Sequence, residues 1–133
     1  MNNATRQRYL QFALRAIGLV FIFGVYPLTV VWPSGWSWHV GQSHYLIMII
    51  GIYATLGAFL FLAAKGPARH ISLISFAIWS SVVHGAIMAV QAFSAPEHMG
   101  HLYGDVLALF VVAAALAFLC PTAARLSFDG RGA

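Results

Sequence analysis

The stretch "YLIMIIGIYATLGAFLFLAA", residues 45–64, contains no charged side chain and no proline. An α-helix rises about 1.5 Å per residue, so about 20 apolar residues are needed to cross the roughly 30 Å hydrocarbon core of a bilayer. This stretch therefore predicts a transmembrane helix. The fold class depends on whether the rest of the chain repeats the pattern.

Three further apolar runs repeat it, over residues 10–31, 71–93 and 97–120. The last run has Asp105 as the only charge within its most apolar part, residues 102–120. The 133 residues are 61% hydrophobic and 8% charged, whereas soluble domains are roughly 45–50% apolar. Because the connecting segments are short, successive helices should be antiparallel neighbours. We therefore expect an all-α fold, a four-transmembrane-helix antiparallel bundle, forming one integral membrane domain over residues 1–133.

The seven Lys and Arg residues all fall on one side of these spans. They are Arg6, Arg8, Arg15, Lys65, Arg69, Arg125 and Arg131. Positively charged loops stay in the cytoplasm, so we expect the bacterial cytoplasmic (inner) membrane with both the N and C termini in the cytoplasm. Trp32, Trp36 and Trp38 lie on the opposite side, where an interfacial aromatic belt is expected.

Several functional classes lack their sequence signals. Cys120 is the single cysteine, so an intramolecular disulfide and a CxxC redox motif are both excluded. No basic stripe with interleaved aromatic residues indicates a nucleic-acid partner. No GxSxG elbow, P-loop or dinucleotide fingerprint occurs, and whether the chain is an enzyme stays open. The expected partners are the lipid bilayer and other membrane subunits or a second copy of the chain.

The stretch "PEHMGHLYGD", residues 96–105, gathers polar side chains toward the outer face. Ser94 and Glu97 have the spacing of a capping box, which offers a structural alternative to a ligand role for Glu97. His101 and Asp105 share a helix face one turn apart, and His98 lies near them. If the helix begins at Pro96, Asp105 lies well inside it, where an unpaired charge costs at least about 2.5–3.5 kcal/mol. Asp105 therefore needs a partner or a proton.

The third span offers such a partner at matching depth. His84, Met88 and Gln91 form a polar and sulfur-containing stripe that should face the bundle. We hypothesise a contact between His84 and Asp105, with His101 above it. The alternative for His84 is a buried neutral imidazole bonded to Ser80 or to a carbonyl.

Imidazoles beside carboxylates also suit a transition metal or a haem. The candidate ligands are His84, His98, His101 and Asp105, with Glu97, His44, Met88 and Gln91 as further candidates. Methionines such as Met88 more often pack than ligate. No HExxH or CxxCH spacing indicates a particular metal or a haem.

Four stretches also carry a family resemblance: "GVYPLTVVWPSGWSWH", "MIIGIYATLGAFLFLAA", "SVVHGAIMAVQA" and "PEHMGHLYGDVLAL". Together they resemble a family of small bacterial four-helix integral membrane proteins of unknown function, an uncharacterised domain family, over about residues 10–121. The resemblance implies a four-helix inner-membrane protein. It implies no activity and no site.

Three functions fit these observations. The first is a structural or accessory membrane subunit, in which a buried polar His/Asp cluster toward the outer face only fixes helix packing. The second is a metal- or haem-binding protein with an outward-facing His/carboxylate site. The third is a proton-coupled small transporter, because an intramembrane Asp near a His is typical of proton-coupled sites.

Overall fold

The computed structural model describes residues 1–39, 41 and 43–125, and Arg131 lies outside this range. Within it the fold is all-helical, with no strand. The elements are α1 (Asn3–Leu19), the π-helix η1 (Val20–Gly24), α2 (Val25–Val31), α3 (Pro33–Trp36), α4 (His44–Ala63), the 3₁₀-helix η2 (Pro67–Arg69), α5 (Ile71–Ser94), the 3₁₀-helix η3 (Pro96–Leu102), α6 (Asp105–Leu119) and α7 (Pro121–Ala124).

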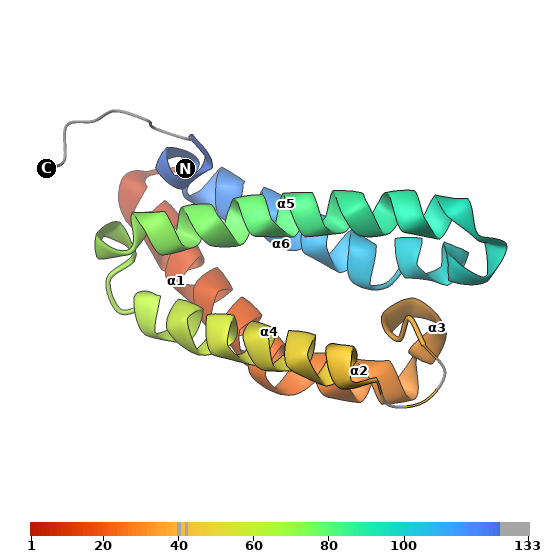
Figure 1. The fold of residues 1–133 in the computed structure, drawn as a ribbon. Helices are drawn as coiled ribbons and strands as arrows, with labels where there is room; N and C mark the ends of the chain where they lie inside the picture. The colour runs from red at the N-terminus through yellow and green to blue at the C-terminus, as the bar shows by residue number, and fades with distance from the viewer. Residues whose placement is uncertain (40, 42, 126–133) are drawn as a thin grey trace, which may run out of the picture.

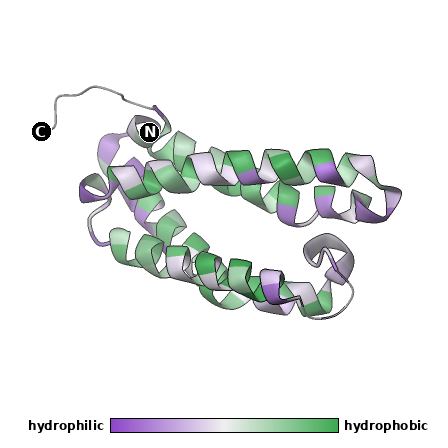
Figure 2. Cartoon of the chain, viewed as in Figure 1, coloured by the Kyte–Doolittle hydropathy of each residue, from purple (hydrophilic) through white to green (hydrophobic). Residues whose placement is uncertain are grey.

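Four continuous stretches are long and apolar enough to cross a membrane. They are Asn3–Val31, His44–Ala63, Ile71–Ser94 and Pro96–Leu119. The sequence prediction of four apolar spans is thus confirmed. Green, hydrophobic residues dominate the middle of the helices in Figure 2, and most hydrophilic ones gather at the two ends of the molecule.

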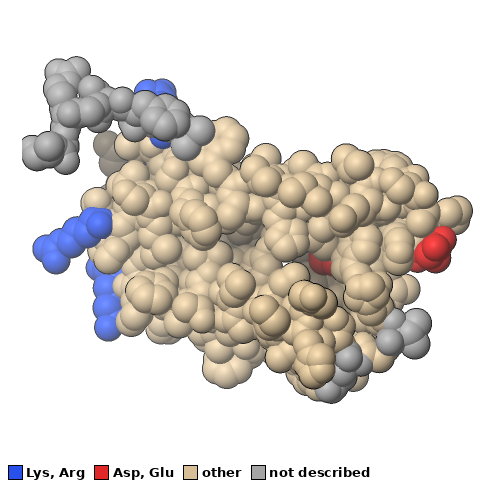
Figure 3. All heavy atoms as spheres, viewed as in Figure 1, with Lys and Arg blue, Asp and Glu red and all other residues tan. Residues whose placement is uncertain are grey.

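The helices form two pairs, α1 with α4 and α5 with α6, whereas α4 and α5 touch little. Figure 1 shows the pairs meeting near the N-terminus and separating toward α3, which curls back between them. We call the first end the basic end, because Figure 3 shows Lys and Arg there. We call the other the open end. The fully buried Leu14, Leu60, Ile74 and Leu116 belong to one large core cluster.

The first span departs from regular α-helix at η1, over Val20–Gly24. Pro27 follows one turn later and has no N–H for the carbonyl of Phe23, so the regular hydrogen-bond ladder cannot continue there. A π turn is a usual way to accommodate such a gap. The π-helix thus lies immediately before the turn of the first span that contains Pro27.

The fourth span begins differently from the sequence expectation. Pro96–Leu102 is a 3₁₀-helix, and the capping box is absent because Ala95 is the N-cap and no described side chain caps it. The hydroxyl of Ser94 instead donates to the carbonyl of Val90, 2.8 Å away. The α-helical part starts only at Asp105.

Two glycines explain why the fourth span is not α-helical before Asp105. A Cβ on Gly100 would lie 2.5 Å from the carbonyl oxygen of Ser34, and a Cβ on Gly104 would overlap the backbone of Gly35. Residues 34 and 35 belong to α3, so α3 packs directly on the backbone of this turn. Only glycine lets two backbones approach so closely. Asp105 consequently stands at the start of α6 and not in its interior.

A second close approach joins α1 and α4. A Cβ on Gly18 would lie 2.6 Å from the carbonyl oxygen of Gly57, and a Cβ on Gly57 would lie 2.6 Å from that of Gly18. Small residues at helix crossings provide this kind of backbone contact in membranes. At Gly51, six residues earlier on α4, such a Cβ would have no atom of another described segment within 4 Å.

This contrast gives a matched test of the crossing. We expect Gly57→Ala to lower the free energy of unfolding by about 1–3 kcal/mol, because the added methyl group meets backbone that cannot move aside cheaply. Gly51→Ala should leave it unchanged or raise it by up to about 1 kcal/mol, through helix propensity. Thermal or denaturant unfolding of the purified protein in detergent measures both. Equal stability of the two variants would contradict this packing.

Candidate functional site

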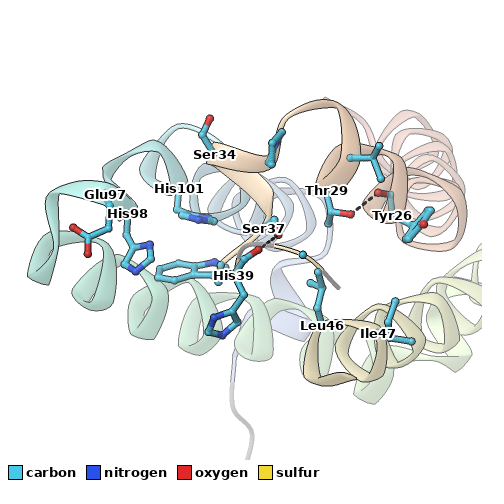
Figure 4. Close-up of a pocket in the computed structure, with 14 residues that line it drawn as sticks. Tyr26, Thr29, Ser34, Ser37, His39, Leu46, Ile47, Glu97, His98 and His101 are labelled. Carbon is cyan, nitrogen blue, oxygen red and sulfur yellow. Dashed lines mark hydrogen bonds between the residues drawn. The ribbon is translucent and has the colours of Figure 1, made fainter. Parts of the chain in front are cut away.

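Two neighbouring hollows lie at the open end of the molecule. The larger is a vestibule of about 590 Å³. In Figure 4, Glu97, His98 and His101 form one of its walls, and Thr29, Leu46 and Ile47 lie across from them. The smaller is a cavity of about 140 Å³ between the helix pairs. Thr29, Trp38 and Leu46 line both hollows, so the two are adjacent.

Asp105 is the centre of the polar residues at this end. Its carboxylate accepts a hydrogen bond from Nε1 of Trp38 at 3.0 Å and from the backbone N–H of Val106 at 2.9 Å. Nδ1 of His101 lies 3.0 and 3.1 Å from its two oxygens. Asp105 is only 8% exposed and His101 only 1%. We call Trp38, His101 and Asp105 the Asp105 cluster.

Each member comes from a different segment of the chain. Trp38 lies in the turn after α3, His101 lies in η3, and Asp105 is the first residue of α6. The indole of Trp38 also stacks on His101, with ring centroids 4.0 Å apart and planes 25° from parallel. His98 lies beside the same indole, at 4.9 Å. The cluster therefore fastens the α3 turn to the start of the fourth span.

His84 belongs to a separate pair. Its Nδ1 lies 3.1 Å from the hydroxyl of Tyr53 on α4. No hydrogen bond joins His84 to Asp105 among the described residues, and the two side chains instead line the smaller cavity together, so the hypothesised contact stays a prediction. The alternative partner, Ser80, donates instead to the carbonyl of Ala77.

The remaining candidates lie outside the cluster. Glu97, His44 and Gln91 are exposed. Met88 is buried and packs with Val106 and Leu109, as expected for a core methionine. Trp38 and Tyr53 are the residues that the sequence analysis missed as hydrogen-bond partners. Their chemistry could have indicated them, because an Asp and a His within the membrane need hydrogen-bond partners. The indole N–H of Trp and the hydroxyl of Tyr can supply these.

The proposed metal or haem ligands do not converge on one point. Within residues 1–39, 41 and 43–125, no three His, Cys, Asp or Glu side chains form a group that could hold a metal ion. His98, His101 and Asp105 are neighbours around Trp38, whereas His84 pairs with Tyr53. Binding of a transition metal or haem stays a prediction.

The four spans and the buried polar residues between them define the class, a multi-pass membrane protein. A family described as a family of unknown function (DUF6632) matches residues 4–130, and the chain belongs to that family. The resemblance to an uncharacterised domain family is thus confirmed. No curated protein and no solved structure matches the chain.

The Asp105 cluster can be tested by a double-mutant cycle. Trp38→Phe and Asp105→Asn should each lower the free energy of unfolding, by about 1.5–3 kcal/mol, because each disrupts a hydrogen bond to a buried charged group. Together they should cost less than the sum, by about 0.5–3 kcal/mol, because Asp105→Asn removes the charge from the same hydrogen bond that Trp38→Phe deletes. Unfolding in detergent provides the four values.

The control is Trp79→Phe, which changes an exposed tryptophan of α5 in the same way. It should cost little alone and combine additively with Asp105→Asn. Additive effects for the Trp38 pair as well would mean that Trp38 and Asp105 do not interact.

Proposed function

We propose that this chain is an accessory subunit of the bacterial cytoplasmic membrane in which the Asp105 cluster has an architectural role. The observation that carries this proposal is the set of donors around Asp105. Its buried carboxylate faces an indole N–H, an imidazole nitrogen and a backbone N–H. A carboxylate hydrogen-bonded in this way can hold the α3 turn, η3 and α6 together.

The architectural role of the cluster follows from the lipid that surrounds the bundle. Lipid provides no hydrogen bonds, so a polar group in a membrane protein must be satisfied inside the bundle. The cluster joins the α3 turn, η3 and α6 at the end where the helix pairs separate. Removing one donor would leave a buried charge incompletely bonded. The cluster would therefore fix the positions of the α3 turn, η3 and α6 relative to one another at the open end.

The orientation is part of the proposal. The Lys and Arg side chains of the described residues lie in α1, between α4 and α5, and after α7. These segments meet at the basic end (Figure 3), whereas Glu97 lies at the open end (Figure 4). This distribution supports an antiparallel bundle with both termini in the cytoplasm and the Asp105 cluster toward the outer face. Other membrane subunits or a second copy of the chain would be its partners.

A proton-coupled small transporter is the second candidate. One specific observation favours it, because the smaller cavity brings His84, Tyr53 and Asp105 around a single space. Intramembrane carboxylates and histidines that share a cavity are typical of proton pathways. The accessory role is preferred because the carboxylate of Asp105 already has three hydrogen-bond partners, Trp38, His101 and the backbone N–H of Val106.

The orientation can be tested with single cysteines in a Cys120→Ala background. Glu97→Cys should react with a membrane-impermeant maleimide added to intact spheroplasts, because residue 97 would face outward. Lys65→Cys should react only after the membrane is permeabilised. Both positions are exposed, so access to the reagent depends only on the side of the membrane. The reverse pattern would contradict the orientation.

The accessory role makes a prediction about assembly. After extraction in native lipid particles without detergent, the protein should migrate as a discrete complex heavier than the single 14.4 kDa chain. The Trp38→Phe variant should lose part of that complex, because the open end is loosened, whereas Trp79→Phe should keep it. Native mass spectrometry measures the species. A wild-type protein found only as the single chain would contradict the accessory role.

A further inference from the structure

The smaller cavity has the size of one aromatic ring. Its volume is about 140 Å³, and an apolar protein cavity of about 150 Å³ is known to admit benzene. Side chains from all four spans form its walls, including Phe21, Ile50, Met88 and Val112. Most of the wall is therefore apolar, and it suits a flat, uncharged molecule.

Tyr53 and His84, which both line the cavity, have one more hydrogen-bond donor than their mutual bond uses. A neutral Tyr53 and a neutral His84 carry one O–H and one N–H between them, and their mutual bond at 3.1 Å uses one of these. Whichever tautomer is present, one donor is left over. No other hydrogen bond from either side chain occurs among residues 1–39, 41 and 43–125. A spare donor between apolar helices needs an acceptor.

The cavity also reaches the surface that would face lipid. Val20 and Ile49 line it, yet each is more than two-fifths exposed, at 48% and 42%. A molecule dissolved in the membrane can therefore approach from the side. The carboxylate of Asp105 at the cavity wall already has its own donors, so it leaves no unpaired charge to attract a cation.

We propose that this cavity is a binding site for a planar, lipid-soluble ring that carries a carbonyl oxygen, of the quinone class. The ring would fill the apolar space, and the carbonyl oxygen would accept the donor left over by Tyr53 and His84. The proposal concerns binding and includes no electron transfer. It goes beyond the accessory role and does not depend on it, because a ligand site and an architectural cluster can share one bundle.

The first test uses the full chain in lipid nanodiscs and a short-chain benzoquinone as the probe. Equilibrium dialysis or calorimetry should show saturable binding of one molecule per chain. Ala108→Leu should abolish it, because Ala108 lines the cavity and the larger side chain fills the space. Ala114→Leu makes the same change on the exposed face of α6 and should leave binding intact.

The second test addresses the donor. Wild-type protein should bind the benzoquinone about two- to twelvefold more tightly than a methylated benzene of similar size, the expected contribution of one hydrogen bond. Each single variant, Tyr53→Phe or His84→Leu, still keeps one donor and should retain a preference. All these variants are made in a Trp36→Phe background, because the buried Nε1–H of Trp36 lines the same cavity and has no hydrogen-bond partner among the described residues. The double variant then has no free donor in the cavity wall and should bind both rings equally, so this test remains informative if Ala108→Leu fails to fold.

Three results would overturn the proposal. One is a wild-type protein that binds no quinone, which would leave the cavity to water or an acyl chain. Another is equal loss of binding in Ala108→Leu and Ala114→Leu, which would indicate partition into the lipid. The third is a preference for the carbonyl ring that survives in the double variant. None of these bears on assembly, so failure here is distinguishable from failure of the accessory role.

Discussion

A carboxylate between apolar helices must find its hydrogen-bond donors within the protein, because lipid offers none. In this chain that constraint applies to Asp105. Its donors come from the turn after α3 and from η3 as well as from its own helix. Satisfying one buried charge therefore positions two segments outside the long α-helices, the turn after α3 and η3. Residues of these segments form part of the walls of the vestibule, and Trp38 and Asp105 line the smaller cavity.

Glycines make this arrangement sterically possible. Gly18 and Gly57 let α1 and α4 cross with their backbones in contact, and Gly100 and Gly104 let α3 rest on the backbone that leads into α6. The helix pairs meet at the basic end and separate toward α3 (Figure 1). The Asp105 cluster joins the turn after α3 to η3 and α6 at that end, and its Trp38 and Asp105 also line the ring-sized cavity.

The spans were predictable from sequence because a long apolar run has few alternatives to a membrane helix. The start of the fourth span was not. Ser94 and Glu97 have capping-box spacing, but the close packing of α3 on Gly100 and Gly104 imposes a 3₁₀-helix and moves the α-helical start to Asp105. Tertiary contact overrode the local signal.

The site was predictable only in part, for a related reason. His101 and Asp105 are four residues apart, so local periodicity pairs them correctly. Trp38 and Asp105 are 67 positions apart, and Tyr53 and His84 are 31 apart. No local pattern encodes such contacts, and the match in depth that suggested a bond between His84 and Asp105 assumed a fourth span that is regular from Pro96.

The most direct measurement is hydrogen exchange of the tryptophan indole N–H groups, followed by NMR on ¹⁵N-labelled protein in lipid nanodiscs. The Trp38 signal, assigned by its loss in Trp38→Phe, should exchange far more slowly than that of the exposed Trp32, because its proton is held by a buried carboxylate. It should become fast in Asp105→Ala. A Trp38 indole that exchanges as rapidly as Trp32 in the wild-type protein would contradict the architectural role of the Asp105 cluster.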